Sequence, residues 1–128
     1  MNSNNPIQRY RWVLLRHIGA LDDLRGIHFD FLLEDQKCCR SWRLSDIPLV
    51  DGPLVNAVFI APHALEWLDI QEKVLSRNRG VATRIKKGIF FKSPQSFQQS
   101  SINLSLTWDD LEVKLLIDNN ACRISSKK

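Results

Sequence analysis

Residues 26–42 read GIHFDFLLEDQKCCRSW, and this stretch decides the fold class of the chain. His28 and Asp30 fall on one face of an extended segment, whereas Phe29 and Phe31 fall on the other. Alternation with a period of two, together with aromatic residues, is typical of a half-buried β-strand. The polar sequence EDQK follows as a turn, and a strand pattern resumes after it. The stretch is therefore predicted to be a β-hairpin that carries an imidazole and a carboxylate on one face.

Short strand-like runs continue on both sides of this hairpin. Pro62 should end the strand before it, the sequence Lys86-Lys87-Gly88 is typical of a tight turn, and residues 93–100 are predicted to be a loop. Many short strands at regular spacing indicate a mostly β protein, either a sandwich or, as we expect, a small antiparallel β-barrel with short helical or loop connections. Outside the hairpin, strands are predicted over residues 10–17, 56–60, 64–72 (where a helix is the alternative), 81–85, 89–92, 102–107, 111–117 and 122–124.

Length and composition indicate one ordinary globular domain. A chain of 128 residues fits a single domain, 1–128, and we expect flexible ends at residues 1–8 and 125–128. No apolar run approaches the roughly 20 residues of a membrane helix, and the polar N-terminus does not resemble a signal peptide. Three cysteines, two of them adjacent, make a poor disulfide framework and fit a reducing compartment. A cytoplasmic protein is expected.

The basic residues leave two interpretations open. The formal net charge of +4 permits a polyanionic partner without requiring one. A basic stretch that includes Arg79, Arg84 and Lys86 is able to follow a DNA backbone, but a solvated strand edge has the same composition.

The three histidines are the candidates for chemistry. His17 closes the first predicted strand, and His28 opens the second. If these strands pair antiparallel, His17 lies beside His28 and Asp30, and two imidazoles with a carboxylate can bind a divalent transition metal. Such a cation polarises a phosphoryl oxygen and offsets its charge. The alternative is that these histidines are hydrogen-bonded structural residues and that Asp30 pairs with an arginine.

The hairpin resembles the signature of the 3′-phosphoesterase domain of bacterial DNA ligase D. That signature is His-aromatic-Asp, then Leu-Glu, a turn and Ser-Trp, and it corresponds here to residues 28–30, 33–34 and 41–42. The family also has a histidine that closes an upstream strand and another in a downstream segment, which correspond to His17 and His63. The resemblance extends over residues 11–90 and more loosely to residue 117.

The resemblance implies a small β-barrel that binds manganese and trims 3′ ends of DNA or RNA–DNA strands, removing a terminal ribonucleotide or a 3′-phosphate in DNA end repair. His17, His28 and Asp30 would be the metal ligands. His28 and His63 would be catalytic, with His63 contacting the scissile phosphate or assisting proton transfer. The residues expected to bind substrate are Trp67, which replaces the family's tyrosine, Arg79, Arg84 and Lys86.

Several positions depart from the family pattern. Leu32 stands where the family has an arginine, and leucine cannot hold a phosphate bidentately. Residues 45–48, SDIP, replace a Pro-Lys-Gly-Pro sequence and lack its lysine, and no acidic residue precedes His63 closely. These departures support a second hypothesis, a catalytically degenerate nucleic-acid-binding or accessory module that retains the barrel. Introducing an arginine at position 32 is expected to distinguish the two hypotheses.

Overall fold

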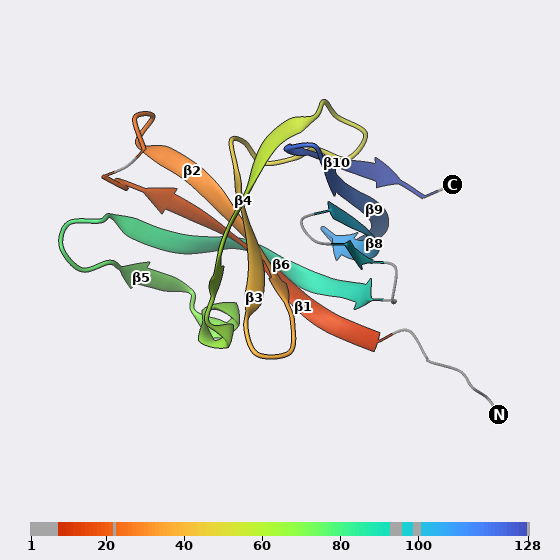
Figure 1. Cartoon of the computed structure of the whole chain (residues 1–128), viewed down its shortest axis with the longest axis horizontal. Coiled ribbons are helices and arrows are strands. Elements are labelled where there is room, and N and C mark those ends of the chain that lie inside the picture. Colours follow the sequence, from red (N-terminus) through yellow and green to blue (C-terminus); the bar gives the residue numbers. More distant parts are fainter. Residues whose placement is uncertain (1–7, 22, 93–95, 99–100, 128) are drawn as a thin grey trace.

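The protein is mostly β and contains a single short helical segment among the described residues, which are 8–21, 23–92, 96–98 and 101–127 of the computed structural model (Figure 1). The segment η1 (Leu65–Asp69) is a 3₁₀ helix. The strands are β1 (Gln8–Ile18), β2 (Ile27–Glu34), β3 (Cys39–Leu44), β4 (Val55–His63), β5 (Glu72–Val74), β6 (Val81–Lys92), β7 (Phe97–Gln98), β8 (Ser101–Trp108), β9 (Leu111–Asp118) and β10 (Ala121–Ser126).

The strands form a closed antiparallel ring. Hydrogen bonding runs in the order β6-β1-β2-β3-β4-β10-β9-β8, and β8 pairs again with β6 through Phe90 and Phe91. β5 and β7 are short additions to β6 and β8. The ring confirms the mostly β class and the small barrel expected from the sequence. Figure 1 shows the β1–β2 and β5–β6 loops at one end of the molecule and β8–β10 at the other.

Two apolar clusters fill the two sides of β1 and β2. The larger one lies within the ring, where the indole of Trp12 stacks on that of Trp108 at 5.0 Å between centroids. The smaller one lies on the opposite face, beneath η1. Because both faces of β2 are covered, the strand is buried along almost its whole length, and this includes the polar residues His28 and Asp30 on its outer face. The smaller cluster consists of Val13, Leu15, Leu32, Cys39 and Leu68, with Leu65 and Trp67 packed against it.

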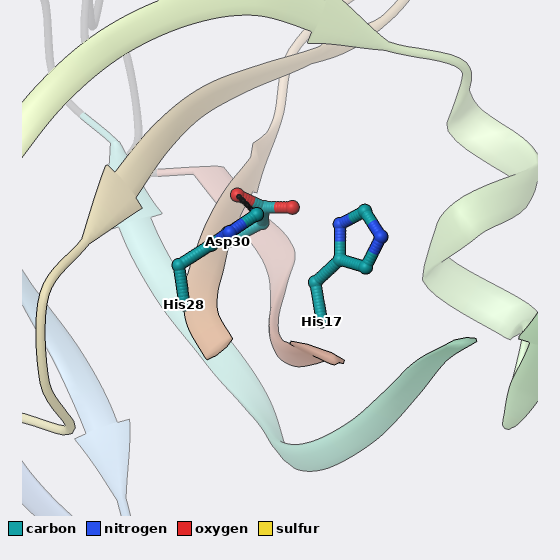
Figure 2. Close-up of side chains that lie close together, drawn as sticks. All are labelled: His17, His28 and Asp30. Carbon is teal, nitrogen blue, oxygen red and sulfur yellow. Dashed lines mark ion pairs between the residues drawn. The ribbon is translucent and has the colours of Figure 1, made fainter. Parts of the chain in front are cut away.

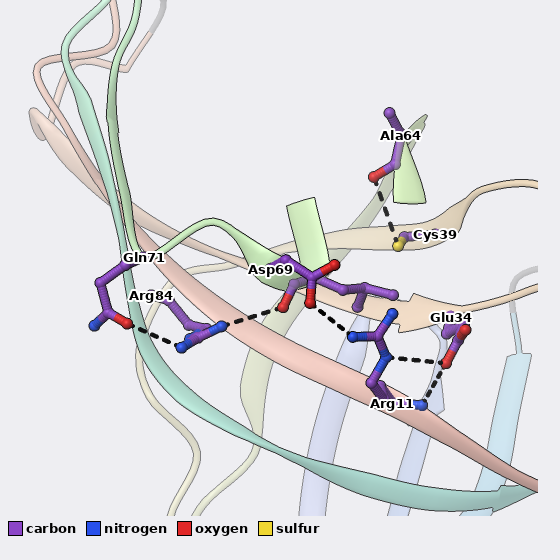
Figure 3. A network of polar contacts seen from close by, with 8 residues as sticks. Arg11, Glu34, Cys39, Ala64, Asp69, Gln71 and Arg84 are labelled. Atoms are coloured by element: carbon purple, nitrogen blue, oxygen red, sulfur yellow. Dashed lines mark hydrogen bonds and ion pairs between the residues drawn. The ribbon is translucent and has the colours of Figure 1, made fainter. Parts of the chain in front are cut away.

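The strand favoured over residues 64–72 is wrong for almost all of its length, since only its last residue, Glu72, lies in β5. A 3₁₀ turn places Leu65 and Leu68 on one side of η1, because residues three apart eclipse each other, and there they pack on the smaller cluster. Polar contacts hold η1 in place (Figure 3). Arg84 Nη1 donates to the Leu68 carbonyl at 3.1 Å, and Arg11 Nη1 donates to Asp69 Oδ1 at 2.8 Å.

The predicted turn at residues 86–88 is also wrong, because β6 runs through it without interruption. Gly88 serves a different purpose here. A Cβ added to it would lie 2.7 Å from the Thr107 carbonyl oxygen and 2.7 Å from Trp12 Nε1, which donates a hydrogen bond to that oxygen. Glycine therefore permits the close approach of β6, β8 and a core tryptophan.

Pro62 does not end the fourth strand as predicted, because β4 continues to His63. The pairing of β3 with β4 shifts register between Cys39 and Ser41, so that Cys39 lies opposite His63 while Ser41 lies opposite Ile60. Such an irregularity accommodates a proline, which has no N–H to donate to the ladder.

The ends and loops follow the prediction in part. Gln8 already pairs with Lys92, and β10 extends to Ser126, so these parts of the ends expected to be flexible lie in strands. Residues 1–7 and 128 of the ends lie outside the described residues. Of the loop expected over residues 93–100, residues 93–95 and 99–100 also lie outside them, and β7 occupies residues 97–98. Residues 109–110 and 119–120 form the turns between β8 and β9 and between β9 and β10, with positive φ at all four residues as in type I′ hairpins.

Candidate metal centre

The structure brings His17, His28 and Asp30 together on the outer face of β1 and β2 (Figure 2). His17 lies directly opposite His28 in the antiparallel register, and Asp30 is two residues further along β2 on the same face. One ligand atom from each residue lies within 4.8 Å of the others. Two imidazole nitrogens and a carboxylate oxygen are a donor set that divalent transition metals accept.

His28 is held with one ring nitrogen toward this cluster. Its Nδ1 lies 2.8 Å from Asp23 Oδ2, so Nδ1 donates its proton to Asp23, and Nε2 is the ring nitrogen that faces Asp30. Nε2 lies 3.4 Å from Asp30 Oδ1, and both of these buried atoms lack a hydrogen-bond partner. Burial lowers the pKa of His28, but the carboxylates of Asp30 and Asp23 raise it by more. The hydrogen bond to His28 in turn lowers the pKa of Asp23.

His17 is oriented in the same way by a different acceptor. Its Nε2 lies 2.7 Å from the Arg79 carbonyl oxygen, which can only accept, so Nε2 donates its proton there and Nδ1 is the nitrogen that remains for a metal. Figure 2 shows one ring nitrogen of His17 facing Asp30 and the other pointing away. Metal-ligating histidines commonly donate their second nitrogen to a carboxylate or a backbone carbonyl. The buried, unpartnered atoms and both ring orientations therefore fit a divalent cation.

We expect Asp23→Ala to weaken manganese binding about 10- to 100-fold, because His28 loses the acceptor that sets its tautomer and orientation. A calorimetric titration with Mn²⁺ measures this change. Asp46→Ala is the matched control, since Asp46 is an exposed carboxylate that pairs with Arg25 and has no contact with the histidines. Equal affinity of the two variants would show that Asp23 does not support the centre.

His63, at the end of β4, is held as a neutral imidazole. Its Nδ1 lies 2.8 Å from the Ser41 hydroxyl, which also lies 2.9 Å from the Cys39 carbonyl oxygen; when the hydroxyl donates to that carbonyl, it accepts a proton from His63 Nδ1. Nε2 of His63 then carries the lone pair. Burial lowers the pKa of His63, and the neighbouring His17 lowers it further, while Asp30 opposes them. At neutral pH His63 can therefore accept a proton.

An open pocket of about 610 Å³ adjoins the cluster. Its apolar wall includes Leu15, Ile60 and the half-buried ring of Trp67, which meets the His63 ring edge-on at 5.9 Å between centroids. Lys73 Nζ lies 5.4 Å from the Trp67 ring. The polar and charged residues that line the pocket are His17, Asp30, Arg43, His63, Lys73, Ser76 and Arg79.

The residues expected to bind substrate separate into two groups. Trp67 and Arg79 line the pocket. Arg84 does not line it, because its guanidinium binds the Leu68 carbonyl and Gln71 beside η1. Lys86 does not line it either, because its ammonium group lies 2.7 Å from Asp109 and over the Trp108 ring.

The sequence did not predict four residues of the site, which are Arg43, Ser41, Asp23 and Lys73. Arg43 lines the pocket from β3. Ser41 and Arg43 are two residues apart in a strand, and this spacing predicts that their side chains share one face. Ser41 was noticed only as part of the resemblance and not as the partner of His63. Asp23 lies in the loop between β1 and β2, where no periodicity predicts which side chain turns inward.

Comparison with known proteins does not place the chain in a family: no protein-family model matches it, and neither does any of the curated proteins compared with it. The resemblance to the 3′-phosphoesterase domain therefore depends on the residues of the site alone. Within the part of the chain that the structure describes, no helix combines the length and apolar character needed to cross a membrane.

Proposed function

We propose that this protein is a cytoplasmic, metal-dependent phosphoesterase that acts on 3′ ends of DNA or RNA–DNA strands, removing a 3′-phosphate or a 3′-terminal ribonucleotide in DNA end repair. The observation that supports this proposal is the cluster of His17, His28 and Asp30, with both imidazoles oriented, beside a pocket that also contains His63.

The residues of the cluster and several residues of the adjoining pocket have separate roles in this proposal. His17, His28 and Asp30 hold a divalent cation, most simply manganese, which when bound polarises a phosphoryl oxygen. His63 is neutral and accepts a proton at Nε2, while Ser41 keeps its Nδ1 protonated. The ring of Trp67 offers an aromatic face on which a nucleobase can stack. Lys73 and Arg79 offset the charge of a polyanionic substrate.

The test is manganese-dependent release of phosphate from a 3′-phosphorylated primer. We expect activity in the wild-type protein, loss of activity with a chelator, and a decrease of about 100-fold or more in His28→Ala and Asp30→Ala, because each substitution removes a ligand. Calorimetry should give binding near one equivalent of Mn²⁺ in the wild-type protein and none in these variants. Unchanged phosphatase activity in His28→Ala, or no binding of Mn²⁺ by the wild-type protein, would overturn the assignment.

A second candidate function is supported by Leu32. Leu32 is fully buried and stands where the family has an arginine. No residue of β2 is an arginine, so the strand offers no substitute for it. A catalytically degenerate nucleic-acid-binding or accessory module would bind Mn²⁺ and DNA ends without turnover. Its affinity for duplex DNA should fall with salt, with a log–log slope of about −0.9 for each phosphate neutralised. Manganese binding without phosphate release in the assay above would favour this function.

A further inference from the structure

Arg43 lies next to the candidate metal centre on the neighbouring strand. It is directly opposite Asp30 in the antiparallel register of β2 and β3. Side chains of directly opposed residues project from the same face, with Cβ atoms about 5 Å apart. A guanidinium therefore stands beside the carboxylate of the centre, on the side of β2 away from β1.

Arg43 also lies at the boundary between two adjoining pockets. The second pocket, of about 330 Å³, extends toward the β1–β2 loop and is lined there by Ala20 and Leu21. It shares His17, Arg43 and Arg79 with the first pocket. A group bound at this boundary can contact the metal centre and both arginines at once, with room for substituents on either side.

The charges at this boundary favour an anion. The guanidinium groups of Arg43 and Arg79 both line this boundary, and a divalent cation bound by His17, His28 and Asp30 would add further positive charge beside them. The guanidinium of Arg79 is partly engaged, because its Nε and Nη2 donate to the carbonyl and hydroxyl of Ser76 in its own loop. Arg43 comes from a central strand of the ring, which is a more rigid support than a loop.

We propose that Arg43 is the residue that binds the substrate's phosphate, and that it does so from β3 at the junction of the two pockets. This proposal rests on the proposed function and specifies its ligand as a phosphoester whose phosphate lies between Arg43 and the metal centre. It also provides, from another strand, the bidentate phosphate contact that Leu32 cannot make.

The test compares two fluorescein-labelled deoxyoligonucleotides that differ only in a 3′-phosphate or a 3′-hydroxyl end, with binding measured by anisotropy in the presence of Mn²⁺. We expect the wild-type protein to prefer the phosphorylated end. Arg43→Ala should weaken binding of that end about 10- to 100-fold and leave the hydroxyl end nearly unchanged, because one charge-assisted contact is lost. The affinity of Arg43→Lys for the phosphorylated end should lie between those of the wild-type protein and Arg43→Ala, since lysine keeps the charge but lacks the planar guanidinium group.

Arg123→Ala is the matched control, because it removes the same charge from an exposed position on β10 that lines neither pocket. It should leave the preference for the phosphorylated end intact. Calorimetry with Mn²⁺ on each variant separates the two proposals. Equal binding of the phosphorylated end by wild-type protein and Arg43→Ala, with Mn²⁺ bound by both, would overturn the assignment of Arg43 alone. Absence of Mn²⁺ binding in the wild-type protein would overturn the proposed function.

Discussion

Replacing Leu32 with arginine is expected to destabilise the protein severely instead of adding a phosphate-binding residue. Leu32 has no exposed surface and packs with Val13, Leu15 and Leu68 beneath η1. A guanidinium at this position would be buried without an arranged partner, at a cost on the order of 4 kcal/mol. The total stability of a domain is roughly 5–15 kcal/mol. If the new side chain reached Asp30 on the same face, it would instead occupy a carboxylate that the metal centre needs.

Thermal unfolding measures this effect, and we expect Tm to fall by more than about 10 °C in Leu32→Arg. Leu111→Arg is the matched control, because it makes the same substitution at a strand residue that is 64% exposed, and it should leave Tm nearly unchanged. A wild-type Tm in Leu32→Arg would show that η1 does not cover this position. An arginine at position 32 therefore reports on the burial of this side chain, and it does not distinguish an active phosphoesterase from a degenerate one.

Replacing Gly80 with alanine is expected to damage both stability and metal binding. Gly80 has φ +94°, and a Cβ there would lie 2.0 Å from the Ile18 carbonyl oxygen. The β5–β6 loop would have to move away from the end of β1, at a cost of about 3 kcal/mol. Because the adjacent Arg79 carbonyl accepts the hydrogen bond from His17, the same movement removes the acceptor that orients this ligand. We expect manganese affinity to fall about 10-fold or more.

Gly26→Ala provides the control for this substitution. Gly26 also has positive φ, at +76°, but no atom lies within 4 Å of the position that its Cβ would take. Alanine at this position should lower the free energy of unfolding by about 1 kcal/mol through backbone strain alone, and it should leave the affinity for Mn²⁺ unchanged. Thermal unfolding and calorimetry on both variants distinguish the clash from the strain. Equal effects of the two substitutions would contradict the role assigned to the contact between Gly80 and β1.

The local patterns of the sequence predicted most of the strands correctly. The hairpin of β2 and β3, for example, follows from alternation around a polar turn. The errors arose where a local preference was overridden by contacts from distant residues. Gly88 suggested a turn, but its neighbours Thr107 and Trp12 require a residue without a Cβ in a straight strand. The apolar residues of η1 alternate like a strand, but Leu68 is drawn onto β1 and β2 as a 3₁₀ turn.

The sequence alone determined the residues that make up the candidate centre and the strands that carry them, because the period of a strand and antiparallel pairing together place His17 beside His28 and Asp30. Only the tertiary structure decided how these residues are supported and what surrounds them. Asp23 and the Arg79 carbonyl orient the two imidazoles from loops, and Arg43 reaches the pocket from a third strand. Leu32, adjacent in sequence to the ligands, is covered by η1. Most of these contacts join residues far apart in the chain, and Asp23, although only five residues from His28, lies in a loop without periodicity, so no local pattern encodes them.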